Sequence, residues 1–170
     1  MAVREVLVYP DPRLKQVSAP VTDLGDSLAA LVADLRDTLA SRPGVGIAAP
    51  QIGEMRRVVL IDVSQRFPER PARIFVNPEI LEVSDKRIFR EGCMSIPDFT
   101  ANVLRGYRVR VRALDEHGQP FELDTDELEA IAIQHECDHL DGLLFLDRVA
   151  SLKTDVFRRK GVPKSVPLPT

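Results

Sequence analysis

The sequence is poor in the residues that most often form cross-links or bind metals. It has two cysteines and three histidines among 170 residues. Cys93 and Cys137 do not form a C-x-x-C zinc or redox motif, and a reducing compartment argues against a disulfide between them. No apolar run approaches the ~20 residues that a helix needs to cross a bilayer, and the first five residues lack the apolar stretch of a secretory signal. We therefore expect a cytoplasmic protein without a membrane partner.

The composition is that of a globular domain with one basic end. Hydrophobic residues make up 44% and charged residues 29% of the chain, which is typical of a soluble fold with a real core. The length suits a single domain over residues 1–170. The net charge is −3, but residues 151–170 hold five Lys or Arg against one Asp. This proline-containing tail can contact a polyanion such as RNA, or it can be an ordinary solvated terminus.

Two long segments have helical spacing. In Asp26–Leu39, apolar residues recur every three or four positions. A second helix is predicted to begin after a cap at Asp124 or Thr125 and to end at Gly142. A short basic helix is expected within 151–159, before prolines that exclude further helix.

The middle of the chain is dominated by strand-like segments. In Arg105–Leu114, tyrosine and valine alternate with arginine, which is the pattern of a half-exposed strand. The glycine-rich segment 44–53 is predicted to be a loop. The expected strands are Arg57–Val63, Arg73–Val76, Ile80–Val83, Arg87–Arg90, Arg105–Leu114 and Gln119–Leu123. Together these elements predict an α+β fold in which mostly antiparallel sheets pack around a central helix.

That central helix carries the most informative motif of the chain. His135 and His139 stand four positions apart, so a helix presents both imidazoles on one face, where they can hold one metal ion. Glu136 follows the first histidine and can handle protons for a metal-bound water. The pattern H-E-x-x-H therefore indicates metal-assisted hydrolysis.

A third metal ligand must come from elsewhere, because catalytic sites of this kind use three protein ligands and one open position. The longer template H-E-x-x-H-x-x-G-x-x-H is excluded, since Phe145 stands where its last histidine would be. No glutamate follows Glu136. Cys137 faces the opposite side of the helix and is expected to be a core residue. Cys93 is the preferred candidate, since a thiolate with two imidazoles is an accepted catalytic set.

Three stretches then resemble one family, the peptide deformylases, which remove the formyl group from the N-terminal methionine of new bacterial and organellar proteins. They are Gly44–Gly53 (GVGIAAPQIG), Glu91–Pro97 (EGCMSIP) and Gln134–Gly142 (QHECDHLDG). The resemblance implies metal ligands at Cys93, His135 and His139. It also implies a metal hydroxide as nucleophile on the formyl carbon, with formate released.

The resemblance assigns further roles within the site. Glu136 is expected to be the general acid/base, and the oxyanion is expected to be stabilised by the Gln51 side chain and the backbone N–H of Met94. The methionine side chain of an N-formyl-methionyl peptide is expected to be bound by Val45, Gly46, Leu128, Ile131 and Ala132. The implied metal is Fe²⁺, replaceable by Zn²⁺, Ni²⁺ or Co²⁺ on purification.

The sequence departs from the family in two places. Many bacterial members have an arginine at the position of Thr100, and many end in a long basic helix used at the ribosome, so ribosome contact through the short tail is a weaker expectation. No specific DNA partner is expected.

A zinc peptidase of the wider H-E-x-x-H kind is disfavoured by the missing later ligands. A non-catalytic metal-stabilised module is disfavoured because structural zinc sites are usually closed by four protein ligands.

Overall fold

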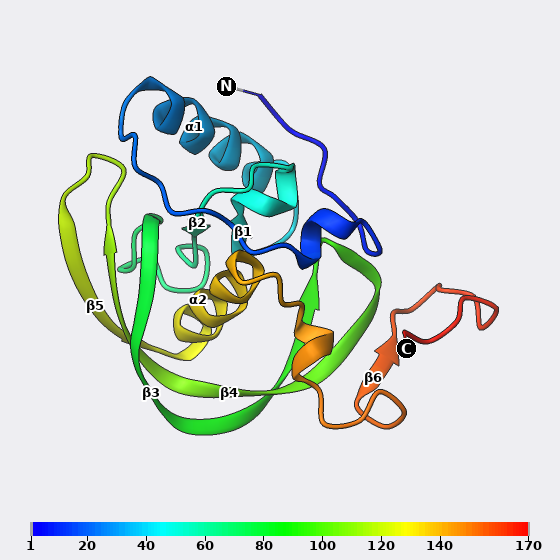
Figure 1. The fold of residues 1–170 in the computed structure, drawn as a ribbon. Coiled ribbons are helices and arrows are strands. Elements are labelled where there is room, and N and C mark those ends of the chain that lie inside the picture. Colours follow the sequence, from blue (N-terminus) through cyan, green and yellow to red (C-terminus); the bar gives the residue numbers. More distant parts are fainter. Residues whose placement is uncertain (1, 170) are drawn as a thin grey trace.

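The computed structural model describes residues 2–169. Within this range, two α-helices and six strands alternate with short 3₁₀ turns (Figure 1). The elements in chain order are η1 (Pro12–Lys15), α1 (Asp26–Ala40), β1 (Gly46–Ala48), η2 (Ala49–Ile52), β2 (Val58–Ile61), β3 (Arg73–Cys93), β4 (Ile96–Leu114), β5 (Pro120–Asp126), α2 (Glu127–Leu140), η3 (Phe145–Arg148) and β6 (Val156–Arg158).

All strands pair antiparallel in the order β1-β2-β3-β4-β5, and β6 pairs with the first part of β4. The long strands β3 and β4 have register shifts at Val76/Glu79, Ile80/Glu82 and Glu91/Cys93. Such bulges bend a strand and increase its twist. Figure 1 shows the resulting curve of β3 and β4 around α2, which lies at the centre of the molecule. The predicted α+β fold with antiparallel strands is confirmed.

Several predicted boundaries are wrong. The three segments expected between Arg73 and Arg90 form one strand, because pairing with β4 continues through residues 82–88 although their side chains are exposed on both faces. The next strand begins at Ile96 rather than Arg105, because residues 96–104 already pair with β3. The expected loop at 44–53 contains β1 and η2. In place of the short basic helix there are turns and strand β6, which β4 stabilises by backbone pairing.

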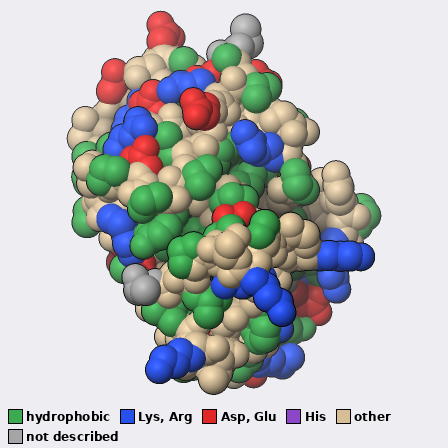
Figure 2. Space-filling view, turned by 90° about the vertical axis from the view of Figure 1, so that its right-hand side faces the viewer, with side chains coloured by type: hydrophobic (Ala, Val, Ile, Leu, Met, Phe, Trp, Pro, Cys, Tyr) green, Lys and Arg blue, Asp and Glu red, His purple; other side chains and the backbone are tan. Residues whose placement is uncertain are grey.

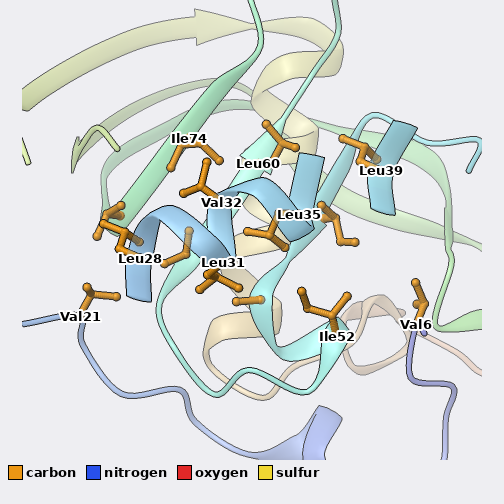
Figure 3. Close-up of a cluster of buried hydrophobic side chains, with 14 residues drawn as sticks. Val6, Val21, Leu28, Leu31, Val32, Leu35, Leu39, Ile52, Leu60 and Ile74 are labelled. Atoms are coloured by element: carbon orange, nitrogen blue, oxygen red, sulfur yellow. The ribbon is translucent and has the colours of Figure 1, made fainter. Parts of the chain in front are cut away.

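Helix α1 matches the prediction from Asp26 onwards and packs its apolar face on β1 and β2. Figure 3 shows Leu28, Leu31, Val32 and Leu35 in one buried cluster with Ile52, Leu60 and Ile74. Burying a leucine side chain contributes roughly 1.5–3 kcal/mol. This cluster therefore holds the β1–η2 segment, which carries Gly46 and Gln51, in a fixed position.

Helix α2 is buried on nearly all sides. It contacts β1, β2, β4 and β5, and Ala130, Ile133, Cys137 and Leu140 belong to one apolar cluster. Its N-cap residue is Asp126, so the predicted caps are wrong by one or two positions. The position of Cys137 in the core is as predicted, and burial raises the pKa of its thiol to about 12. None of the helices described is both long and apolar enough to cross a membrane.

Candidate metal centre and active site

The side chains of Cys93, His135 and His139 lie together, although the cysteine and the first histidine are 42 positions apart in the sequence. Their candidate ligand atoms all lie within 4.8 Å of one another. The Cys93 Sγ lies 3.4 Å from Nε2 of His139. The two imidazoles lie edge to face with centroids 5.2 Å apart, as their i, i+4 spacing on α2 dictates.

This donor set fits a divalent transition metal ion. Ligands at about 2.0–2.3 Å from a tetrahedral ion lie roughly 3.3–3.8 Å from one another, and the sulfur–nitrogen distance of 3.4 Å agrees with that geometry. Burial lowers the pKa of His139 well below its ordinary value. Its imidazole is therefore neutral, and a neutral ring has the lone pair that a metal ligand needs.

The turn between β3 and β4 positions the cysteine. Cys93 ends β3 and Ile96 begins β4, so only Met94 and Ser95 form the turn. The backbone N–H of Ser95 donates to the Cys93 Sγ at 3.4 Å, and the Gln51 side-chain amide approaches the same sulfur at 3.5 Å. These two N–H groups hold the sulfur of Cys93 in a fixed position at the end of β3.

The Gln51 side chain is fixed at both ends. Its Oε1 accepts from the backbone N–H of Ala48 at 2.9 Å, and its Nε2 donates to Ser95 Oγ at 3.1 Å. The residue is 1% exposed. Its amide N–H₂ group is therefore held in a known orientation beside Cys93.

A buried ion network orients His135 from behind. Its Nδ1 lies 2.8 Å from Glu91 Oε1, which leaves Nε2 as the ligand atom. Arg105 donates to both Glu91 oxygens, at 2.7 and 3.0 Å. Burial alone raises the pKa of Glu91, but the bonds from His135 and Arg105 outweigh burial and lower that pKa to about 2. A carboxylate on the far nitrogen of a ligating histidine fixes the tautomer and the ring orientation.

The network continues to the far end of α2. Arg105 also donates to Asp138 at 2.6 Å, and Arg148 donates to the two oxygens of Asp138 at 2.8 and 3.2 Å. Glu91, Arg105 and Asp138 are all buried. The chain of ion pairs thus ties α2 to β3, β4 and η3 around the two histidines.

The carboxyl group of Glu136 is buried. Burial raises its pKa to about 7, and its Oε2 has no hydrogen-bond partner among residues 2–169. A Cβ at Gly46 would stand 2.9 Å from both Cγ and Oε1 of Glu136. Only glycine therefore lets β1 approach this carboxyl group so closely. A carboxyl group with a pKa near neutrality can both accept and release a proton at physiological pH.

These groups share one cavity of about 480 Å³, a size typical of small-molecule sites. Apart from His139, which lies buried behind it, every site residue predicted from the sequence lines this cavity: Val45, Gly46, Gln51, Cys93, Met94, Leu128, Ile131, Ala132, His135 and Glu136. Figure 2 shows Lys and Arg side chains scattered among hydrophobic ones on one face of the molecule.

The residues that support the candidate ligands were not predicted from the sequence. Arg105 could have been noticed in the sequence. In a strand it lies on the same face as Tyr107, Val109 and Val111, so it places a charged side chain on an otherwise apolar face. Asp138 has no role in the site predicted from the sequence. The arginines that line the cavity, Arg42, Arg90 and Arg159, had no local signal.

The fold and the site define an α+β protein with a Cys-His-His group that could hold a metal ion, beside a cavity that contains a buried glutamate. Comparison with known proteins gives the family. The family profile of polypeptide deformylases matches residues 3–155. The peptide deformylase of Alkalilimnicola ehrlichii is 44% identical over 160 residues, covering 94% of this chain and 89% of that protein. Peptide deformylase 1 of Ralstonia nicotianae is 47% identical over 161 residues, covering 94% of each.

Solved structures agree. A crystal structure of a peptide deformylase from Legionella pneumophila superposes with a TM-score of 0.84 at 41% identity, over 89% of each chain. That of the Synechococcus elongatus peptide deformylase in complex with actinonin superposes with a TM-score of 0.82 at 36% identity, over 86% of this chain and 80% of the other. The chain belongs to the peptide deformylase family. It is an enzyme of that family, as the resemblance predicted.

Proposed function

We propose that this protein removes the N-formyl group from the formyl-methionine of nascent polypeptides and releases formate. The observation that carries the proposal is the buried Glu136 carboxyl group in the same apolar-lined cavity as Cys93 and His135. Membership of the peptide deformylase family supports the same reaction.

Cys93, His135 and His139 are proposed to hold one divalent metal ion, and Fe²⁺ is the ion that we expect. When bound, such an ion acts as a Lewis acid and makes a water molecule nucleophilic at neutral pH. Glu136 takes a proton at its carboxylate and later gives it to the leaving amine. Its pKa of about 7 lets it serve in both directions.

The negative charge that develops on the formyl oxygen needs donors that are already in place. Gln51 offers the side-chain N–H that points towards the Cys93 sulfur, because the bonds to Ala48 and Ser95 hold its amide in place there. The backbone N–H of Met94, in the turn after Cys93, is proposed as the second donor. Val45, Gly46, Leu128, Ile131 and Ala132 are proposed to bind the methionine side chain within the cavity.

The direct test is formate release from formyl-Met-Ala-Ser, assayed anaerobically with Fe²⁺ and again with Ni²⁺. In Glu136→Ala, metal content is expected to stay near one ion per chain while kcat falls by about 10²–10⁴-fold, as for loss of a general acid/base. Glu129→Gln is the matched control, since Glu129 is buried on the same helix and bonds to Thr125 outside the cavity. Unchanged turnover in Glu136→Ala would remove the proposed role.

Two measurements distinguish the proposed function from the two alternatives, a zinc peptidase and a non-catalytic module. A zinc peptidase would cleave unformylated peptides, whereas we expect no cleavage of them. A non-catalytic module would show a closed metal site, so the visible spectrum of the Co²⁺ form would not respond to an added anion. We also propose that actinonin, which the Synechococcus elongatus protein binds, raises the Tm of the metal-loaded protein.

The place of action is proposed to be the cytoplasm. The free thiols of Cys93 and Cys137 are consistent with a reducing compartment. Ribosome contact through the basic segment 151–170 stays a prediction, and so does the assignment of the whole chain to one catalytic domain.

A further inference from the structure

The C-terminal segment brings one arginine to the cavity. Strand β6 pairs with β4 through Phe99–Arg158, Thr100–Phe157 and Ala101–Val156, and the backbone N–H of Arg159 donates to the Asp98 carbonyl at 2.9 Å. The Arg159 side chain then lines the cavity.

Its guanidinium lies against the backbone of Gly92. A Cβ at Gly92 would overlap an Nη atom of Arg159 and would stand 3.6 Å from Thr100 Cγ2. The position of Arg159 therefore depends on a glycine directly before the proposed ligand Cys93. Arg159 follows the residues that the family profile covers, which end at 155.

The charge of the cavity rim is positive. Arg42, Arg90 and Arg159 line it, together with the carboxylates Glu91 and Glu136. Glu91 is neutralised by Arg105. Arg90 is engaged elsewhere, since it bonds to Asn102 and stacks on Phe157 at 3.7 Å.

Arg159, by contrast, has no hydrogen bond or ion pair from its guanidinium to any residue in 2–169, and its side chain is exposed. Such a group has five N–H donors and one charge available for a ligand. A guanidinium binds carboxylates with two parallel hydrogen bonds.

We infer that Arg159 binds the part of the substrate peptide that follows the formyl-methionine, and that it favours an acidic side chain there. This inference rests on the proposed function. With the formyl group beside Cys93 and the methionine side chain against Val45 and Leu128, the rest of the peptide leaves past the exposed residues of the lining, of which Arg159 is one.

The test compares kcat and KM on three C-terminally amidated peptides, formyl-Met-Ala-Ser, formyl-Met-Asp-Ser and formyl-Met-Lys-Ser, with the metal-loaded enzyme. For Arg159→Ala we expect the Asp-to-Lys ratio of kcat/KM to fall by about tenfold through KM, with kcat changed by less than about twofold. The salt dependence of that ratio should fall with it. Arg159→Lys should keep most of the preference, because it keeps the charge. Lys160→Ala is the matched control, since it removes the next charge along the chain from a residue that does not line the cavity.

Three results would overturn the inference: an unchanged ratio in Arg159→Ala, an equal change in Lys160→Ala, or a lower kcat on all three peptides together with a lower Tm, which would indicate a structural role. If the wild-type protein releases formate from none of the peptides, the proposed function itself fails and the inference fails with it. Formate release by the wild type with no effect of Arg159→Ala refutes the inference alone.

Discussion

The Glu91 carboxylate offers a sharp test of how the site is held together. It accepts from His135 and from both Nε and Nη2 of Arg105, with three distances between 2.7 and 3.0 Å. Glu91→Ala removes these bonds and leaves the Arg105 charge with Asp138 as its remaining partner. We predict a large loss of stability together with a loss of metal affinity.

The magnitude follows from burial. Glu91 and Arg105 side chains are 6% and 4% exposed, and removing one partner of a buried ion pair costs about 3–5 kcal/mol. The pKa of Glu91 gives a second route to this number: it is lowered from 4.5 to about 2, and one pKa unit corresponds to about 1.4 kcal/mol. Both routes indicate a contribution on the order of 3 kcal/mol. For a chain of this size, we expect the Tm to fall by about 6–12 °C.

The assay is thermal unfolding of the metal-free protein, followed by metal titration. Glu91→Gln is expected to lose less stability than Glu91→Ala, since its amide oxygen still accepts from His135. In Glu91→Ala, metal affinity should fall by about 10- to 100-fold. The control is Glu79→Ala on the same strand, which breaks the exposed pair with Arg112 and should change the Tm by less than about 2 °C.

The pH dependence has a defined sign. Because the pKa of Glu91 is lower in the folded protein, its contribution is fully present above pH 4.5 and is lost as the pH falls towards about 2. The Tm difference between wild type and Glu91→Gln should therefore shrink over that range. A Tm difference below about 2 °C at pH 7, or one that does not change with pH, would refute the ion-network reasoning.

Three further predictions concern the proton-transfer and oxyanion groups. Gly46→Ala places a Cβ 2.9 Å from Glu136 Oε1 and should lower kcat by about tenfold or more, while far-ultraviolet circular dichroism shows the fold intact. Burial raises the pKa of Glu136 to about 7. The folded protein therefore favours the protonated carboxyl group, and stability is lost as the pH rises through that value and the group ionises. Glu136→Gln should therefore raise the Tm of the metal-free protein by about 5 °C or more at pH 8 and not at pH 4, and equal shifts at both would contradict this. Gln51→Ala removes a fixed donor and should lower kcat about 10²–10³-fold with KM little changed. A rise in KM alone would place Gln51 in substrate binding instead.

Local patterns predicted the two long helices well and the sheet poorly. The spacing of Leu28, Leu31 and Leu35 depends only on the helical period, and the structure follows it. Strand β3 could not be traced from its residues, because 82–88 are polar or exposed on both faces and belong to a strand only through pairing with β4. Strand β6 was missed for the same reason. Its three residues have no periodicity, and β4 alone specifies them.

The same distinction applies to the site. His135, Glu136 and His139 were predictable, since one helix sets their spacing, and Cys93 followed from the need for a third ligand. The Glu91–Arg105–Asp138 network could not be assembled, because its members come from β3, β4 and α2. Yet Arg105 on an apolar strand face was a visible anomaly. An arginine in such a place must be paired to be tolerated. In the sequence, carboxylates stand beside the ligands at Glu91, two positions before Cys93, and at Asp138, next to His139. The position of Arg105 therefore predicts a buried carboxylate partner. Beside a helix with two histidines, that carboxylate is a candidate to orient one of the imidazoles.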